Sequence, residues 1–351
     1  GKDAGSIQIV SHDAIIEGSF NGNTIKGELQ RELPTALNDQ PAYLRNFMEF
    51  AKGSSFSLDF TRSLFPFNRD VRIDNIAQNI GLESGDVGID TPLDTNHVVN
   101  LDQSLFNSSG LSHFSITSSG RVDLLNDTNL NLLSAGSLLI ESTGTLLEGS
   151  ITAPGGDINI TSGSIRLDSG SNLNVAGLWV NDALSVISQE SPTFDKKIID
   201  GGSVNLSGRQ SLILENGTDI DVSAGAYLPV LGNLADVTPG NAGSISVGVE
   251  TGTEQDALLT LGGSFSGYAL LGGQGGALSI NTNSVEINSN GQGLNQSTLY
   301  LDDNFFALGG FQNFEVISNR EGLLVDSTAQ INPVLQNYQL NSNAFSSGTT
   351  T

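Results

Sequence analysis

Residues 154–177 read PGGDINITSGSIRLDSGSNLNVAG and contain three short runs in which apolar and polar residues alternate. The runs are Ile158–Ile160, Ile165–Leu167 and Leu173–Val175, and Gly, Ser, Asp and Asn separate them. Alternation with a period of two is typical of a strand with one buried face, and the separating residues favour turns. Because each run is too short to form a stable hairpin by itself, we expect these strands to stack on further copies of the same unit.

Such copies recur along the chain. Residues 201–225, GGSVNLSGRQSLILENGTDIDVSAG, repeat the Gly-Gly opening and the three runs in the same order, and weaker copies occur before and after. The glycines that open the copies are Gly136, Gly156, Gly202, Gly243 and Gly276. Their unequal spacing indicates rungs of unequal length that carry loops, as repeat architectures allow. The sequence therefore predicts an all-β fold, a parallel β-helix (solenoid) in which each strand pairs with the equivalent strand one rung away.

The alternation also predicts which side chains face the interior. We expect Asn159 and Asn205 to point outward, where stacked amides can hydrogen-bond along a ladder. The flanking residues expected to point inward are Ile158, Ile160, Val204 and Leu206.

Composition limits the classes of partner and chemistry. The chain has 42 glycines, 37% hydrophobic residues and 15% charged residues, which fits a turn-rich β protein with a continuous core. The formal net charge of −24 opposes binding to nucleic acid, so we expect no nucleic-acid partner. The absence of cysteine excludes disulfides and thiolate metal sites.

One segment departs from the strand pattern. Residues 33–52, LPTALNDQPAYLRNFMEFAK, almost lack glycine, and Leu44, Phe47, Met48 and Ala51 have the i, i+3, i+4, i+7 spacing of an amphipathic helix. Further phenylalanines follow at positions 50, 56, 60, 65 and 67. We expect a short helical, aromatic-rich insertion that covers the first rungs, or alternatively a surface for a partner or a second subunit. The residues predicted for such a contact are Phe47, Met48, Phe50, Phe65 and Phe67.

Two stretches near the end resemble a known family. The segments SFSGYALLGGQGGALSI (264–280) and NFFALGGFQNFEVIS (304–318), together with the repeated Gly-Gly rungs, are similar to the filamentous-haemagglutinin-like large exoproteins of two-partner secretion. The resemblance covers residues 110–335 and implies a right-handed β-helical rod. It also implies export through an outer-membrane partner transporter to the surface of a Gram-negative bacterium. The chain lacks the secretion domain by which that family engages its transporter, so we expect an internal or C-terminal segment of a longer protein.

The resulting organisation has four parts. We expect first β-helix rungs in 1–29, the helical and aromatic insertion in 30–70, the main β-helix in 71–335, and a polar tail or linker in 336–351.

Enzymatic chemistry has little support in the sequence. Catalysis on polysaccharides by a β-helix requires clustered carboxylates with basic groups. The candidates are Asp219 with Asp221, and Asp302 with Asp303, which we expect to lie on a solvated face and in a turn, respectively. The three histidines, His12, His97 and His113, lack metal or triad spacing. We therefore expect no enzyme and no catalytic, cofactor or metal site.

The leading hypothesis is a structural rod segment of a secreted, cell-surface adhesin. Host-cell or matrix glycans and proteins are then candidate partners, besides the transporter. The alternatives are a self-assembling extracellular filament subunit, which associates end to end, and a β-helical carbohydrate-active enzyme.

Overall fold

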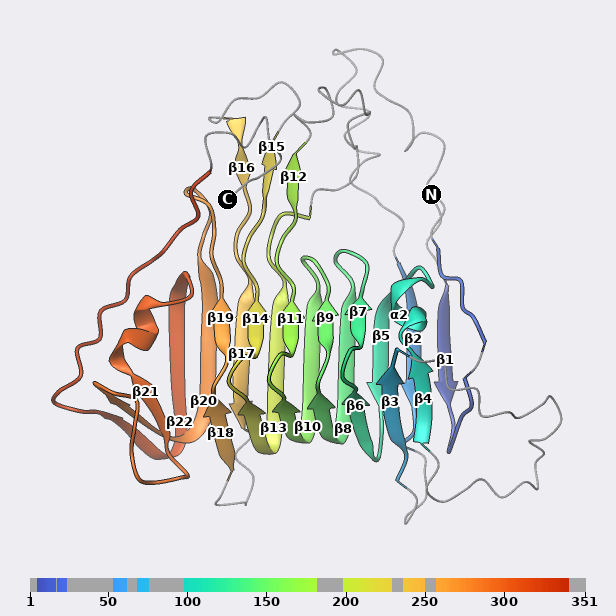
Figure 1. Ribbon diagram of the computed structural model, residues 1–351, viewed down its shortest axis with the longest axis horizontal. Helices are drawn as coiled ribbons and strands as arrows, with labels where there is room; N and C mark the ends of the chain where they lie inside the picture. Colours follow the sequence, from blue (N-terminus) through green and yellow to red (C-terminus); the bar gives the residue numbers. More distant parts are fainter. Residues whose placement is uncertain are drawn as a thin grey trace.

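The computed structural model describes residues 5–16, 18–23, 53–61, 68–75, 98–181, 198–228, 236–249 and 257–340. These residues form an all-β structure in which nearly all strands pair in parallel; the single antiparallel pair joins two short strands, β15 and β16. Figure 1 shows the strands side by side, from blue β1 at one end to orange β21 and red β22 at the other.

The described strands belong to three sheets. The large sheet has 14 strands: β1 (Ser6–Val10), β2 (Ser54–Asp59), β3 (Asp70–Asp74), β4 (Val98–Asp102), β5 (Leu111–Thr117), β6 (Arg121–Leu124), β8 (Ser137–Leu147), β10 (Asp157–Leu167), β13 (Ser203–Leu214), β17 (Ser244–Val249), β18 (Leu258–Leu261), β20 (Gly276–Asn288), β21 (Leu299–Asp302) and β22 (Phe311–Val325). The 5-stranded sheet consists of β7 (Asn129–Asn131), β9 (Ser150–Thr152), β11 (Asn172–Asn174), β14 (Asp219–Asp221) and β19 (Ser264–Ser266). The 3-stranded sheet consists of β12 (Trp179–Asn181), β15 (Ala226–Leu228) and β16 (Thr238–Pro239). Two short helices, α2 (Ser104–Asn107) and the 3-10 helix η3 (Asp303–Ala307), complete the described elements.

The core is built from columns of apolar side chains that run through successive strands. Parallel pairing keeps equivalent residues opposite one another, so the inward side chains stack across the whole large sheet. One column of nine residues is Ile7, Phe56, Phe114, Leu138, Ile158, Val204, Ile245, Leu278 and Phe314. A parallel column two residues later in each strand includes Ile140, Ile160, Leu206 and Val247. Both columns bury their central members completely, so the hydrophobic core is continuous along the stack.

The predicted orientation of the side chains is confirmed. Ile158, Ile160, Val204 and Leu206 are buried, whereas Asn159 and Asn205 are only partly buried. The Asn205 Nδ2 group donates a hydrogen bond to Oδ1 of Asn159 at 3.2 Å, which is the expected contact between amides stacked along the ladder.

The glycines that mark the repeats also stack on one another. Gly136, Gly156, Gly202 and Gly243 precede residues that pair in register, and a Cβ on any of the last three would overlap the carbonyl oxygen of the glycine before it. That carbonyl accepts the amide of the following rung, for example Ser203 N to Gly156 O at 2.9 Å. A side chain would prevent this close approach, which explains why glycine recurs there.

The structure corrects one part of the predicted insertion at 30–70. Residues Ser54–Asp59 form β2, which lies between β1 and β5 in the large sheet, and Phe56 and Phe60 are buried in its core. The sequence SSFSLDF alternates with a period of two, so Phe56 in β2 and Phe60 directly after it point into the core and do not cover the strands from outside. The helix predicted within 33–52 lies outside the described residues.

The predicted polar tail is described as far as residue 340. There Tyr338 is partly buried and packs on Trp179, with ring centroids 6.1 Å apart, and on Tyr268 at 5.2 Å. The amide of Tyr338 donates to the carbonyl of Ala269 at 2.8 Å, so this part of the tail is attached to the body of the protein.

Candidate functional site: a groove between two strand edges

The large sheet divides among its C-terminal strands, after β13. The long strand β13 is followed by two shorter strands, because its first half pairs with β17 and its second half with β18. The next strand, β20, pairs with β17 through Ala277–Asn281, but its second half pairs with β21 and β22 and not with β18. Among the described strands, β18 therefore pairs only with β13, and β21 only with β20.

The backbone groups on these two edges point toward the gap. The amide of Gly262 donates to the carbonyl of Leu214 in β13 at 2.7 Å. Because backbone groups alternate in direction along a strand, the N–H and C=O of Leu259 and Leu261 point away from β13.

Strand β21, on the opposite side of the gap, also directs backbone groups into it. The carbonyl of Ile287 accepts from Asp326 beyond β22 at 2.9 Å, so the groups of Glu286 point the other way, toward β21. Glu286 is opposite Tyr300, and in a parallel ladder it bonds to the neighbours of that residue. The N–H and C=O of Tyr300 consequently point away from β20.

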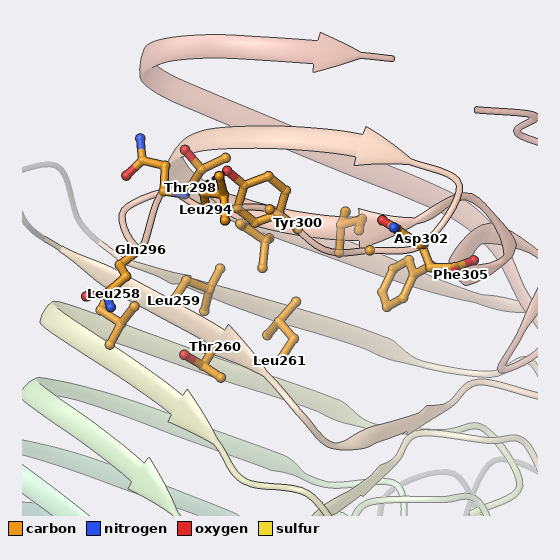
Figure 2. A pocket seen from close by; sticks show the side chains of 16 residues that line it. Leu258, Leu259, Thr260, Leu261, Leu294, Gln296, Thr298, Tyr300, Asp302 and Phe305 are labelled. Atoms are coloured by element: carbon orange, nitrogen blue, oxygen red, sulfur yellow. Dashed lines mark hydrogen bonds between the residues drawn. The ribbon is translucent and has the colours of Figure 1, made fainter. Parts of the chain in front are cut away.

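A groove of 510 Å³ separates the two edges. Figure 2 shows Leu258, Leu259, Thr260 and Leu261 along one wall, with Thr298, Tyr300, Asp302 and Phe305 opposite them. The remaining lining residues are Asn290, Gly291, Gly293, Leu294, Asn295, Gln296, Leu299 and Leu301. This volume lies within the range of ordinary ligand sites, and Asp302 is the only charged residue among those that line the groove.

The rim loop that precedes β21 is held by its own side chains. Asn290 and Asn295 each accept an amide two residues later, from Gln292 and Ser297, both at 3.1 Å. The Tyr300 hydroxyl accepts the amide of Asn295 at 3.1 Å. These local turns preorganise the groove wall formed by β21 and its preceding loop before any ligand is present.

The core leucines beside the groove are slightly more exposed than those of the neighbouring strand β13. Leu212 and Leu214 of β13 are 0% exposed, whereas Leu259 of β18 is 6% and Leu299 of β21 is 7% exposed. The groove therefore lies against the edge of the hydrophobic core, where no further described strand pairs with β18 or β21.

The residues predicted as a partner contact are not placed by the structure. Phe47, Met48, Phe50, Phe65 and Phe67 all lie outside the described residues, and so does His97. His113 is exposed on β5, where its Nδ1 lies 2.9 Å from the Ser137 hydroxyl.

The Asp219–Asp221 pair lies on the outward side of β14, on either side of buried Ile220. Asp219 accepts the Ser264 hydroxyl at 2.7 Å and so bonds to the next strand, whereas Asp221 accepts the amide of Ser223 at 2.8 Å. Burial raises the pKa of Asp221, and burial likewise raises the pKa of the nearby Tyr338 hydroxyl.

The second acidic pair, Asp302 and Asp303, is used in a turn as predicted. Asp302 caps η3 by accepting the amide of Asn304 at 2.8 Å. Asp303 is buried and accepts the amide of Gln330 at 2.7 Å, which ties the following segment to the helix. Among the described residues, no group of three or more His, Cys, Asp or Glu side chains could hold a metal ion.

Sequence reasoning missed the groove. The two signals that could have indicated it are the long strand-like run ALSINTNSVEIN at 277–288 and the second run LYLD at 299–302, which follows without the Gly-Gly opening of a new rung. They indicate an extra strand that belongs to no repeat.

Comparisons with known proteins identify no relative: no family model, no curated protein and no solved structure matches the chain. In the part of the chain that the structure describes, no helix is long and apolar enough to cross a membrane.

Proposed function

We propose that the chain is a right-handed parallel β-helix and serves as a rod segment of a secreted bacterial surface adhesin. The observation that carries this proposal is the core column that runs in register through nine parallel strands, from Ile7 in β1 to Phe314 in β22. Such a column supports a stack that grows along one axis, and a stack of this kind separates its two ends by a fixed distance.

The connections between strands support a helical path. Strands β8, β9, β10 and β11 follow one another in the chain, yet β8 pairs with β10 and β9 pairs with β11, both in parallel. The chain therefore alternates between two sheets as it advances one strand at a time. Crossovers between parallel strands of one sheet are right-handed in nearly all proteins, which supports the handedness that we propose.

Secretion and the surface location rest on the resemblance of the Gly-Gly rungs and the C-terminal segments to two-partner secretion exoproteins. An outer-membrane transporter and host-cell or matrix ligands are the partners that this proposal implies. The net charge of −24 also suits an extended β protein with open strand edges, because like charges keep copies apart.

Two measurements test the proposal. Small-angle X-ray scattering of the purified chain should give the asymmetric pair-distance distribution of a rod with a constant cross-section. Immunogold labelling of intact cells of the source bacterium should place the chain outside the outer membrane. A compact particle would contradict the rod, and label confined to the cytoplasm would contradict the surface location.

A filament subunit is the second candidate, because both ends of the large sheet carry exposed apolar side chains. Ile7 and Val10 of β1, and Leu323, Leu324 and Val325 of β22, are all exposed. Paired edges of this kind would join copies head to tail without closing. Light scattering over a series of concentrations separates the two candidates, since only a filament subunit grows in mass as concentration rises.

A further inference from the structure

We infer that the groove between β18 and β21 binds an extended peptide, which enters as an additional parallel strand and pairs with both edges. The inference adds a partner class to the proposed rod but depends only on the groove. A failure of the rod proposal in scattering or labelling would leave it intact.

The backbone of both walls offers unpaired strand edges to the groove. Leu259 and Leu261 on one wall and Tyr300 on the other direct N–H and C=O groups into the groove, and neither strand pairs with a further described strand. Open strand edges recruit other strands through main-chain hydrogen bonds. Here two such edges face each other across one groove, so a single inserted strand would satisfy both.

The groove also lies beside core leucines of both walls. Leu259 and Leu299 are 6% and 7% exposed, whereas Leu212 and Leu214, one strand earlier, are 0% exposed. An inserted strand with apolar residues at alternate positions would cover these side chains and continue the core column. Because β18 and β21 each contain four residues, the occupant needs an extended segment of comparable length.

Charge restricts the occupant further. The described residues that line the groove have amide, hydroxyl and apolar side chains, and Asp302 is the only charged residue among them. The chain carries a net charge of −24. The preferred occupant is therefore a neutral or basic peptide with alternating apolar residues, because an acidic segment would be repelled.

A peptide with the chain's own sequence at 209–215, RQSLILE, is the natural probe. In the folded chain, residues 211–214 of β13 pair in parallel with β18 on the edge of β18 that faces away from the groove. A peptide with the same side chains therefore suits β18 in parallel register. Binding of the fluorescein-labelled peptide to the full chain is followed by fluorescence anisotropy, and hydrogen exchange with mass spectrometry locates the site. We expect saturable binding, with slower exchange of the 258–261 amides and of Tyr300. The amides of 211–214 should be unchanged, because they are already paired.

Variants of Leu261 separate main-chain pairing from simple contact. Leu261→Pro removes an N–H that points into the groove without removing a bond to β13, and should weaken binding at least about tenfold. Leu261→Ala keeps that N–H and should change affinity less than about threefold. If Leu261→Pro fails to fold, Tyr300→Pro provides the test on the other wall, compared with Tyr300→Ala, which loses the same hydroxyl contact to Asn295 but keeps the N–H. A peptide with proline in place of Leu212 is the control on the side of the ligand.

Several results would overturn the inference. These are absence of saturable binding at millimolar peptide, equal affinity of the proline and alanine variants, or protection at the β1 or β22 edge in place of 258–261. Saturable binding of neutral oligosaccharides with no binding of the peptide would assign the groove to glycans. Concentration-dependent dimerisation that protects the same amides would assign it to a second copy of the chain.

Discussion

The middle of the stack, from β8 to β15, and its C-terminal part, from β17 to β22, are built from the same repeat but pack differently. In the middle, β10 pairs along almost its whole length with β8 on one side and β13 on the other. In the C-terminal part, β20 follows this plan for its first half only, and β21 separates its second half from β18. Complete rungs thus give a closed core, whereas one inserted strand out of step with the repeat produces a groove.

The largest effect that we predict tests the closed core of the middle rungs. Ile160→Asp would bury an unpaired carboxylate at a position that is 0% exposed, and should destabilise the fold by about 4 kcal/mol or more. Asn159→Asp, on the neighbouring outward position, should cost about 1 kcal/mol or less, because its Oδ1 can still accept the Asn205 amide. Urea denaturation followed by circular dichroism measures both. Equal midpoints would contradict the assignment of inner and outer faces.

The second prediction compares equivalent core leucines in the two regions. Leu212 and Leu259 are register partners, but only Leu259 lies beside the groove. Leu212→Ala leaves an enclosed cavity and should cost about 3 kcal/mol. Leu259→Ala should cost about 2 kcal/mol or less, since the groove lets neighbouring side chains and water fill the space. Denaturant midpoints decide the order, and a larger loss for Leu259→Ala would show that the C-terminal region packs as tightly as the middle.

The third prediction concerns the shifts of register within two long strands, between Ser162 and Ser164 in β10 and between Thr282 and Ser284 in β20. In β10 the Ser162 hydroxyl is buried and bonds to Ser142 and, at 2.7 Å, to the hydroxyl of Thr145. At the shift in β20, Asn283 is 2% exposed, and neither polar atom of its side chain has a hydrogen-bond partner among the described residues.

The two substitutions at these positions should change the stability of the fold in opposite directions. Ser162→Ala breaks satisfied hydrogen bonds and should destabilise by about 1 kcal/mol. Asn283→Leu removes two unsatisfied groups at similar volume and should be neutral or stabilising by about 1 kcal/mol. Thermal unfolding of the two variants beside the parent chain is the measurement. Destabilisation by Asn283→Leu would mean that the carboxamide has a structural role that its present contacts do not explain.

The regular region could be predicted from the sequence, but the groove region could not. The parallel stacking was predictable, because Gly156 and Gly202 open matching runs and the alternation around Asn159 fixes inside and outside. The strand at 54–59 was misassigned because Phe56 and Phe60 were grouped with the phenylalanines around them, although SSFSLDF alternates. The groove was not predicted: LYLD at 299–302 indicates an extra strand, but no local pattern shows which strand β20 pairs with, because that pairing joins residues far apart in the sequence.

The smallest predicted effects are shifts with pH that have opposite signs in the two regions. In the middle region, burial raises the pKa of Asp221 above its ordinary value of 3.8. The native state then binds more protons than the unfolded state just above pH 3.8, so stability falls as the pH rises through the folded-state pKa. Asp221→Asn should abolish this loss and be more stable than the parent at neutral pH, with the difference vanishing in acid.

In the C-terminal region, the hydroxyl and amide of Thr328 donate to Asp326 at 2.6 and 2.8 Å and lower the pKa of that carboxyl. The ionised Asp326 carboxylate stabilises the fold above pH 3.8, and this stabilisation is lost as the pH falls through the lowered folded-state pKa. Asp326→Asn should therefore be less stable than the parent at neutral pH and equal to it in strong acid. Melting temperatures of both variants and the parent, recorded between pH 2 and pH 7, test the pair. Asp326 is only partly buried, so solvent screens its interactions and its effect should be the weaker of the two. Differences of the same sign at neutral pH would contradict the distinction between a carboxylate desolvated in the middle region and one stabilised by hydrogen bonds at the open end.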